Sequence, residues 1–116
     1  MIKGCKYGTH RVIEPQGVLP QPALKINNDM NIYSNEILID VMALNVDSAS
    51  FTQIEEEAGH DVEKIKAKIK EIVGERGKMQ NPVTGSGGML IGTIEKIGDD
   101  LVGTTDLKVG DKIATL

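Results

Sequence analysis

Apolar residues recur along this chain with two periods, and each period predicts its own kind of secondary structure. Over residues 61–75 they fall three and four positions apart, which predicts one amphipathic helix with a single apolar face. Asp61 can cap its first turn, and Gly74 or Gly77 can end it. We interpret the apolar face as core packing and not as a partner-binding groove, because such a stripe usually faces the protein's own core. It consists of Val62, Ile65, Ile69, Ile72 and Val73.

A period near two predicts strands in other segments. Residues 37–44 alternate, but both faces are largely apolar, which is typical of a strand that is covered on both sides or curls within a barrel. That strand ends at residues 45–48, where Asp47 or Ser48 can cap a short helix that runs through residues 51–54. Three more segments are predicted to be strands: residues 9–14, 89–97 and 112–116.

Proline and turn residues dominate the two long segments between these elements. Residues 15–35 contain Pro15, Pro20 and Pro22, and residues 98–111 are rich in glycine and aspartate. Both segments are predicted to be loops. The pattern as a whole predicts a mainly β domain with one amphipathic helix and one short helix, and 116 residues are enough for one such domain.

Composition and charge narrow the function classes. The net charge is −4 and aromatic residues make up 3% of the chain, so the surface suits neither nucleic acid nor an anionic membrane. No apolar run can span a bilayer and the N-terminus lacks a signal-peptide core, so the expected location is cytoplasmic. Cys5 is the single cysteine and cannot form an internal disulfide. His10 and His60 lie far apart, and we interpret them as surface or hydrogen-bonded residues and not as metal ligands.

Residues 82–98, PVTGSGGMLIGTIEKIG, hold a glycine cluster of the kind that can bind phosphate. A dinucleotide fingerprint needs G-x-G-x-x-G between a strand and a helix. Position 90 is leucine where that pattern needs glycine, and the residues that follow favour a strand. No Gly-Lys-Ser/Thr of a P-loop follows either. We therefore expect a bend where the backbone approaches another group closely, and not a phosphate cradle.

Polar residues gather at the end of the predicted strand 37–44. They are Asn45, Asp47, Ser48, Ser50 and Thr52. At a strand end such side chains can face a cleft. For Asp47 and Ser48, helix capping and turn formation explain the pattern equally well.

The order of these elements and two motifs resemble the N-terminal GroES-like domain of the medium-chain dehydrogenases/reductases. One motif is the spacing of Gly92, Ile94, Ile97 and Gly98, and the other is GDKIA at residues 110–114. The stretches ILIDVMALNVDSASFTQI and ERGKMQNPVTGSGGMLIGTIEKIG resemble more closely the branch of that family that acts on a diamino acid in lysine fermentation. The resemblance covers essentially the whole chain. It implies a GroES-like, partly open β-barrel over residues 1–116.

For function, the resemblance implies the N-terminal catalytic domain of an NAD- or NADP-dependent oxidoreductase. The implied reaction is oxidative deamination of a small-molecule substrate, L-erythro-3,5-diaminohexanoate, to 5-amino-3-oxohexanoate with release of ammonium. A doubly wound nucleotide-binding domain follows this one in the family, so the chain is expected to be an N-terminal fragment without activity of its own. The residue that selects NAD or NADP would lie in that other domain. The alternative is a stand-alone GroES-like binding or assembly module, which the coding DNA beyond Leu116 would distinguish.

The resemblance also implies where the cleft lies. Zinc-dependent members carry Cys at the strand end and His-Glu after the loop glycine, where this chain has Asn45-Val46-Asp47 and Ser86-Gly87, so no zinc is expected. Asp47 is the best candidate to pair with a substrate ammonium group. The cleft-lining catalytic candidates are Asn45, Asp47, Ser48 and Ser50, and those assigned to the cofactor side are Thr84, Gly85, Ser86, Gly87 and Gly88. Apolar surface left uncovered by an absent domain would favour a homo-oligomer.

Overall fold

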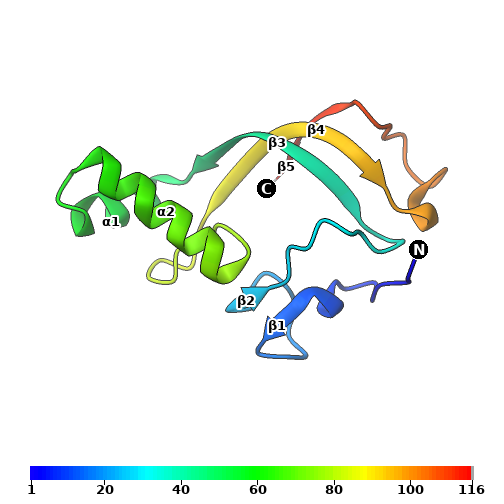
Figure 1. The fold of residues 1–116 in the computed structure, drawn as a ribbon, viewed down its shortest axis with the longest axis horizontal. Helices are drawn as coiled ribbons and strands as arrows, with labels where there is room; N and C mark the ends of the chain where they lie inside the picture. The colour runs from blue at the N-terminus through cyan, green and yellow to red at the C-terminus, as the bar shows by residue number, and fades with distance from the viewer. Residues whose placement is uncertain (116) are drawn as a thin grey trace.

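Two antiparallel sheets and two helices make up the computed structural model, which describes residues 1–115 (Figure 1). The smaller sheet pairs β1 with β2, and the larger has the strand order β3-β4-β5. Within these residues neither sheet closes into a barrel, so the predicted mainly β, open fold class is confirmed. The elements are β1 (Val12–Glu14), β2 (Lys25–Ile26), β3 (Ile37–Val46), α1 (Ser48–Glu57), α2 (Val62–Arg76), β4 (Gly88–Ile97) and β5 (Lys112–Thr115), with 3-10 turns at Thr9–Arg11 and Asp99–Leu101.

The larger sheet is a long curved ribbon of β3 and β4, with β5 paired along part of β4 (Figure 1). Its register runs from the Ile37–Ile97 pair at one end to the Val46–Gly88 pair at the other. Two register shifts interrupt the ladder, and irregularities of this kind bend a strand and increase its twist. The strands predicted at 89–97 and 112–116 are confirmed, although Leu116 lies outside the described residues.

The middle of β3 departs from expectation, because its apolar side chains are exposed on both faces. Val41 is 51% exposed, Met42 is 60% exposed, and every residue from 40 to 45 is exposed. The sequence predicted a strand that is either covered on both sides or curls within a barrel, and the first alternative is wrong for the described residues. The physical reason is placement: both helices lie at one end of the ribbon and cover neither face of its middle (Figure 1).

The core lies where α1 and α2 pack together. Ile54 of α1 meets Ile65 and Ile72 of α2, and all three are buried. The predicted amphipathic helix and its role in core packing are therefore confirmed, although Val62 in the first turn is 61% exposed. The short helix, predicted for residues 51–54, extends from Ser48 to Glu57.

The N-terminal segment also differs from the prediction of one strand over residues 9–14. Thr9–Arg11 forms a 3-10 turn, and the strand begins only at Val12. The turn directs the Arg11 guanidinium toward Glu36, to which it donates two hydrogen bonds of 2.8 and 2.7 Å. The predicted loop 15–35 contains one regular piece, β2, whose two residues pair with β1. No helix in residues 1–115 is long and apolar enough to cross a membrane.

Candidate functional site

The end of β3 and the start of β4 bring two separate sequence segments together at the helix α1. Asp47 is the N-cap of α1, and its Oδ1 accepts a hydrogen bond of 2.7 Å from the backbone N–H of Ser50. The same oxygen accepts 3.2 Å from the hydroxyl of Ser86, which precedes β4. Among the described residues, no hydrogen bond reaches Asp47 Oδ2. The half-buried carboxylate therefore caps a helix with one oxygen and leaves the other available.

Ser50 of α1 holds the loop at residues 84–86 in place through hydrogen bonds. It is fully buried, and its hydroxyl donates 3.0 Å to the backbone carbonyl of Ser86 and lies 3.3 Å from Thr84 Oγ1. The Thr84 and Ser86 hydroxyls are 2.9 Å apart, so a line of hydroxyl groups leads to the Asp47 carboxylate. Each buried hydroxyl is satisfied, which makes the arrangement rigid.

Asn81 organises the loop that joins α2 to β4. It is almost fully buried, and its side chain donates 2.8 Å to Gln53 Oε1 while accepting 2.9 Å from the Val83 N–H. Its backbone N–H donates to the Ser86 carbonyl, and its carbonyl accepts from the Gly85 N–H, each at 2.7 Å. A short Asx-type turn results, and it presents residues 84–88 toward α1.

Gly87 and Gly88 are required by close backbone approach. A Cβ on Gly87 would collide with the Met79 carbonyl, and a Cβ on Gly88 would collide with the Asn45 carbonyl. The sequence prediction of a bend with close approach is therefore confirmed at these two positions. The residues that follow form β4 and not a helix, so the helix N-terminus that a dinucleotide fingerprint needs does not follow this loop.

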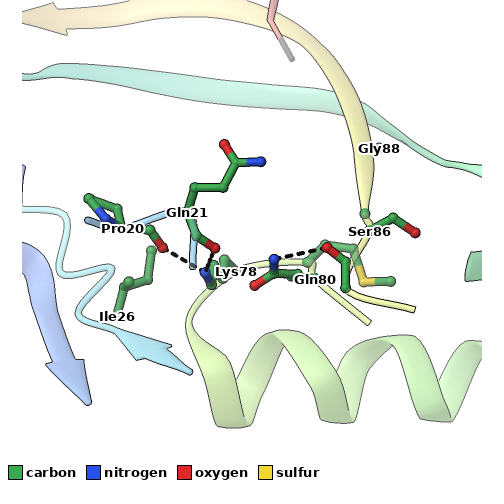
Figure 2. A pocket seen from close by; sticks show the side chains of 10 residues that line it. Pro20, Gln21, Ile26, Lys78, Gln80, Ser86 and Gly88 are labelled. Carbon is green, nitrogen blue, oxygen red and sulfur yellow. Dashed lines mark hydrogen bonds between the residues drawn. The ribbon is translucent and has the colours of Figure 1, made fainter. Parts of the chain in front are cut away.

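A cavity of about 330 Å³ lies on the other side of the same loop (Figure 2). One wall is residues 85–88, the facing wall is the segment around Pro20, and Lys78 and Gln80 lie between them (Figure 2). Gln80 closes the floor by donating 3.0 Å to the Gly85 carbonyl. The full lining is Pro20, Gln21, Ile26, Lys78, Met79, Gln80, Gly85, Ser86, Gly87 and Gly88.

Lys78 gives this cavity a positive charge. Its Nζ donates 2.6 Å to the Pro20 carbonyl and 2.7 Å to the Gln21 carbonyl. Among residues 1–115 no carboxylate lies within 4.0 Å of it. Partial burial lowers the pKa of the Lys78 ammonium, and the positive charge of Arg76 lowers it further. Arg76 is itself held by carbonyl and amide oxygens, and no ion pair joins it to any described carboxylate.

The structure brings some of the predicted site residues together and leaves others apart. Asp47, Ser50, Thr84 and Ser86 form one hydrogen-bonded cluster, and residues 85–88 line the cavity. Asn45 and Ser48 are exposed and make no side-chain hydrogen bond with that cluster. Whether any of these residues contacts a substrate stays a prediction.

Sequence reasoning missed Lys78, Gln80 and Asn81. A signal for the lysine was present, because no acidic residue occurs between Glu75 and Glu95 while two basic side chains do. That acid-free stretch contains the whole glycine loop. Asn81-Pro82 is a typical turn sequence and predicts the loop. It does not predict that the Asn81 side chain is buried.

A second hollow, of about 400 Å³, lies beside Arg11 and the start of β3. Its cation is already compensated, because Arg11 pairs with Glu36 and also donates to three backbone carbonyls. His10 Nε2 lies 3.0 Å from the same Glu36 carboxylate, and His60 is exposed near Glu55. Across residues 1–115 no group of three His, Cys, Asp or Glu side chains gathers as metal ligands would. Of these two hollows, the cavity at residues 85–88 is therefore the one that offers an uncompensated charge.

Comparison with known proteins gives a consistent family. The model of the L-erythro-3,5-diaminohexanoate dehydrogenase N-terminal domain family matches residues 10–116. A curated protein of Fusobacterium nucleatum named L-erythro-3,5-diaminohexanoate dehydrogenase is 90% identical over 116 residues, which are 100% of this chain and 34% of that protein. One of Acetoanaerobium sticklandii with the same name is 88% identical over 115 residues, 99% of this chain and 33% of that protein. The chain thus spans about a third of the length of the curated relatives it matches.

Proposed function

The chain belongs to the L-erythro-3,5-diaminohexanoate dehydrogenase N-terminal domain family, and we propose that it forms the substrate side of a dehydrogenase of that specificity. The observation that carries this proposal is 88–90% identity, along essentially the whole chain, to proteins with that name. In the complete protein the reaction is the oxidative deamination of 3,5-diaminohexanoate at C3, with NAD or NADP as the oxidant. A soluble, cytoplasmic enzyme of amino-acid fermentation is the setting we propose.

The chemistry sets the demands on the site. The C3 ammonium group loses a proton, and the C3 hydrogen leaves as hydride, which a bound nicotinamide accepts. The resulting iminium carbon adds water and releases ammonium, which leaves the 3-oxo group. The sum consumes one water and one oxidised nicotinamide, and it produces ketone, ammonium, reduced nicotinamide and one proton. The protein must therefore hold a cationic amine in place and position it for hydride loss.

Asp47 meets the first demand in our proposal. Its Oδ1 is fixed by the Ser50 N–H and the Ser86 hydroxyl, so its carboxylate has one orientation, and Oδ2 is left for an ammonium group. A charge-assisted hydrogen bond to a fixed carboxylate is stronger than one to a neutral acceptor. Ser50 acts as a positioning residue here, because it is fully buried and bonds to the loop.

Residues 84–88 meet the second demand. Gly85 has open space around its missing side chain, and no acidic residue lies in the loop, so its exposed edge is uncharged backbone and two hydroxyls. That edge suits close approach by a flat nicotinamide, and we propose that residues 84–88 contact it. Phosphate binding belongs to polypeptide other than this loop, because no helix begins there.

The test is a product balance on the complete protein, at the length of its relatives. Purified enzyme, 3,5-diaminohexanoate and either NAD⁺ or NADP⁺ should yield reduced nicotinamide and ammonium in equal amounts. Reduced nicotinamide is followed by absorbance, and ammonium by a coupled assay. A protein that reduces neither nicotinamide with this substrate would overturn the proposed function.

A further inference from the structure

We propose that the cavity beside residues 85–88 is a carboxylate site, in which Lys78 pairs with the carboxylate end of the diamino acid substrate. The inference rests on the proposed function and assigns the part of the substrate that does not react. Figure 2 shows Lys78 between the Pro20–Gln21 segment on one side and Ser86 and Gly88 on the other. Three features of the site support this assignment: a spare N–H donor on Lys78, a positive charge without a counter-ion, and the Asp47 carboxylate behind the loop.

The first step is the hydrogen-bond capacity of the lysine. An ammonium group has three N–H donors and no acceptor. Two donors are used by the Pro20 and Gln21 carbonyls, and among the described residues the third has no acceptor. The two carbonyls fix the position of Nζ at the cavity wall, so that the third donor is preorganised for a ligand.

The second step is charge. None of the ten residues that line the cavity is acidic, and no described carboxylate lies within ion-pair distance of Lys78. Arg76 adds a second cation behind it, bonded to neutral oxygens only. A partly buried cation without a counter-ion is unfavourable, and an anion that enters the cavity removes that penalty.

The third step separates a carboxylate from a phosphate as the occupant. Ser86 lines the cavity, and its hydroxyl donates 3.2 Å to the Asp47 carboxylate, so a negative charge lies behind the loop that forms the wall opposite the Pro20–Gln21 segment. A doubly charged phosphate would be repelled by Asp47. A zwitterion with a carboxylate at one end and ammonium groups along its chain is complementary to both charges. The amino acid substrate has that distribution of charge.

The experiment begins with the unmodified complete enzyme and two substrates. 3,5-Diaminohexanoate is compared with 3,5-diaminohexanamide, in which a neutral amide replaces the carboxylate. Loss of a charged hydrogen bond at about 1.5–3 kcal/mol should raise KM by about 10- to 100-fold for the amide. Activity with the diamino acid tests the proposed function, and the ratio of the two KM values tests the carboxylate site separately.

Variants then assign the effect to Lys78. Lys78→Met should raise KM for the diamino acid by about 10- to 100-fold, leave KM for the amide unchanged and so abolish the discrimination. Lys78→Arg, which keeps the positive charge, should retain part of the discrimination between acid and amide. Lys68→Met is the matched control, because Lys68 is partly exposed and pairs with Glu57 away from the cavity. It should behave as the unmodified enzyme does.

Three results would overturn the inference. The first is an equal KM for acid and amide with the unmodified enzyme. This result needs no variant, so it counts even if Lys78→Met fails to fold. A Lys78→Met enzyme whose KM rises for NAD(P) and not for the diamino acid would assign the cavity to a cofactor phosphate. If Lys78→Met raised KM equally for acid and amide, Lys78 would have only a structural role, which is to hold the Pro20–Gln21 segment in place.

Discussion

Asp47 combines two roles that a single substitution can separate. Asparagine caps helices about as well as aspartate, so Asp47→Asn keeps the Ser50 hydrogen bond and removes the negative charge. In the complete enzyme we expect kcat/KM for 3,5-diaminohexanoate to fall by about 10- to 100-fold, the loss expected for a charged hydrogen bond. Steady-state kinetics measure the fall, and thermal unfolding checks that stability is retained.

Asp61 provides the control for Asp47. It is the N-cap of α2, and its carboxylate accepts 3.0 Å from the Lys64 N–H, in the same way and far from residues 84–88. Asp61→Asn should leave kcat/KM unchanged. Equal effects of the two substitutions, or none from Asp47→Asn, would remove Asp47 from the substrate site.

Substitution by alanine is expected to destabilise the protein at Gly87 and to stabilise it at Gly74. Gly87→Ala drives a methyl group into the Met79 carbonyl and should cost about 1–3 kcal/mol of unfolding free energy. Gly74 lies inside α2 with open space around its missing side chain, so Gly74→Ala should add about 0.5–1 kcal/mol. Urea denaturation of both variants measures the difference, and a neutral Gly87→Ala would contradict the close approach described here.

These residues also show what the sequence could reveal at this scale. Asp47 and Asp61 were predictable caps, because each stands before a helical segment and each uses a short side chain. Lys78 was not, because its position depends on the Pro20–Gln21 segment, which lies almost sixty residues away in the chain and has no periodic pattern. Contacts between residues so far apart in the sequence depend on tertiary packing, which the local pattern of apolar and polar residues does not encode.

Glu36, just before β3, ties the 3-10 turn Thr9–Arg11 to the loop at Tyr33 and makes stability depend on pH. The Arg11 guanidinium, the Tyr33 N–H and His10 together hold the pKa of Glu36 at about 2, against an ordinary value of 4.5, although burial opposes them. The side chain is 20% exposed, so solvent screens these contacts little. The lowered pKa corresponds to about 3 kcal/mol of stability.

The sign of this dependence follows from the depressed pKa. The stabilisation is fully present above the unfolded value of 4.5 and is lost as the pH falls toward about 2. Glu36→Gln should therefore lower the unfolding free energy by about 3 kcal/mol at pH 7, with a difference that vanishes near pH 2. Urea denaturation across that range measures it, with Glu63→Gln on an exposed helix face as the control. A difference that is the same at every pH would contradict the role of the Glu36 charge.

The elements differ in how far their sequences determined them. The α2 helix was predictable in full, because a 3.6-residue period, a cap and a terminal glycine all agree. The 9–14 segment was not, because the Arg11–Glu36 contact favours a turn in residues whose propensities favour a strand. The identity of β3 was predictable and its environment was not, since apolar alternation does not say what lies over a strand.

At the scale of the whole molecule, the chain is more open than its length requires. Its radius of gyration is 15.5 Å, whereas a compact domain of this length has about 13 Å. Its accessible surface is 7660 Å², against about 6,200 Å² for a compact chain of 12.5 kDa. The excess includes the exposed apolar side chains of β3 and β4, which are Val41, Met42, Leu44, Met89 and Ile91. An exposed apolar surface of this kind marks an interface.

The 116-residue chain studied alone should therefore self-associate through this ribbon. Met42 is 60% exposed, so Met42→Lys should shift the chain toward monomer without loss of core packing. Light scattering with size-exclusion chromatography over a range of concentrations measures the shift. Val62→Lys, at a 61% exposed position in the first turn of α2, is the matched control. A chain that stays monomeric at every concentration, or an equal effect of both lysines, would contradict an interface at β3.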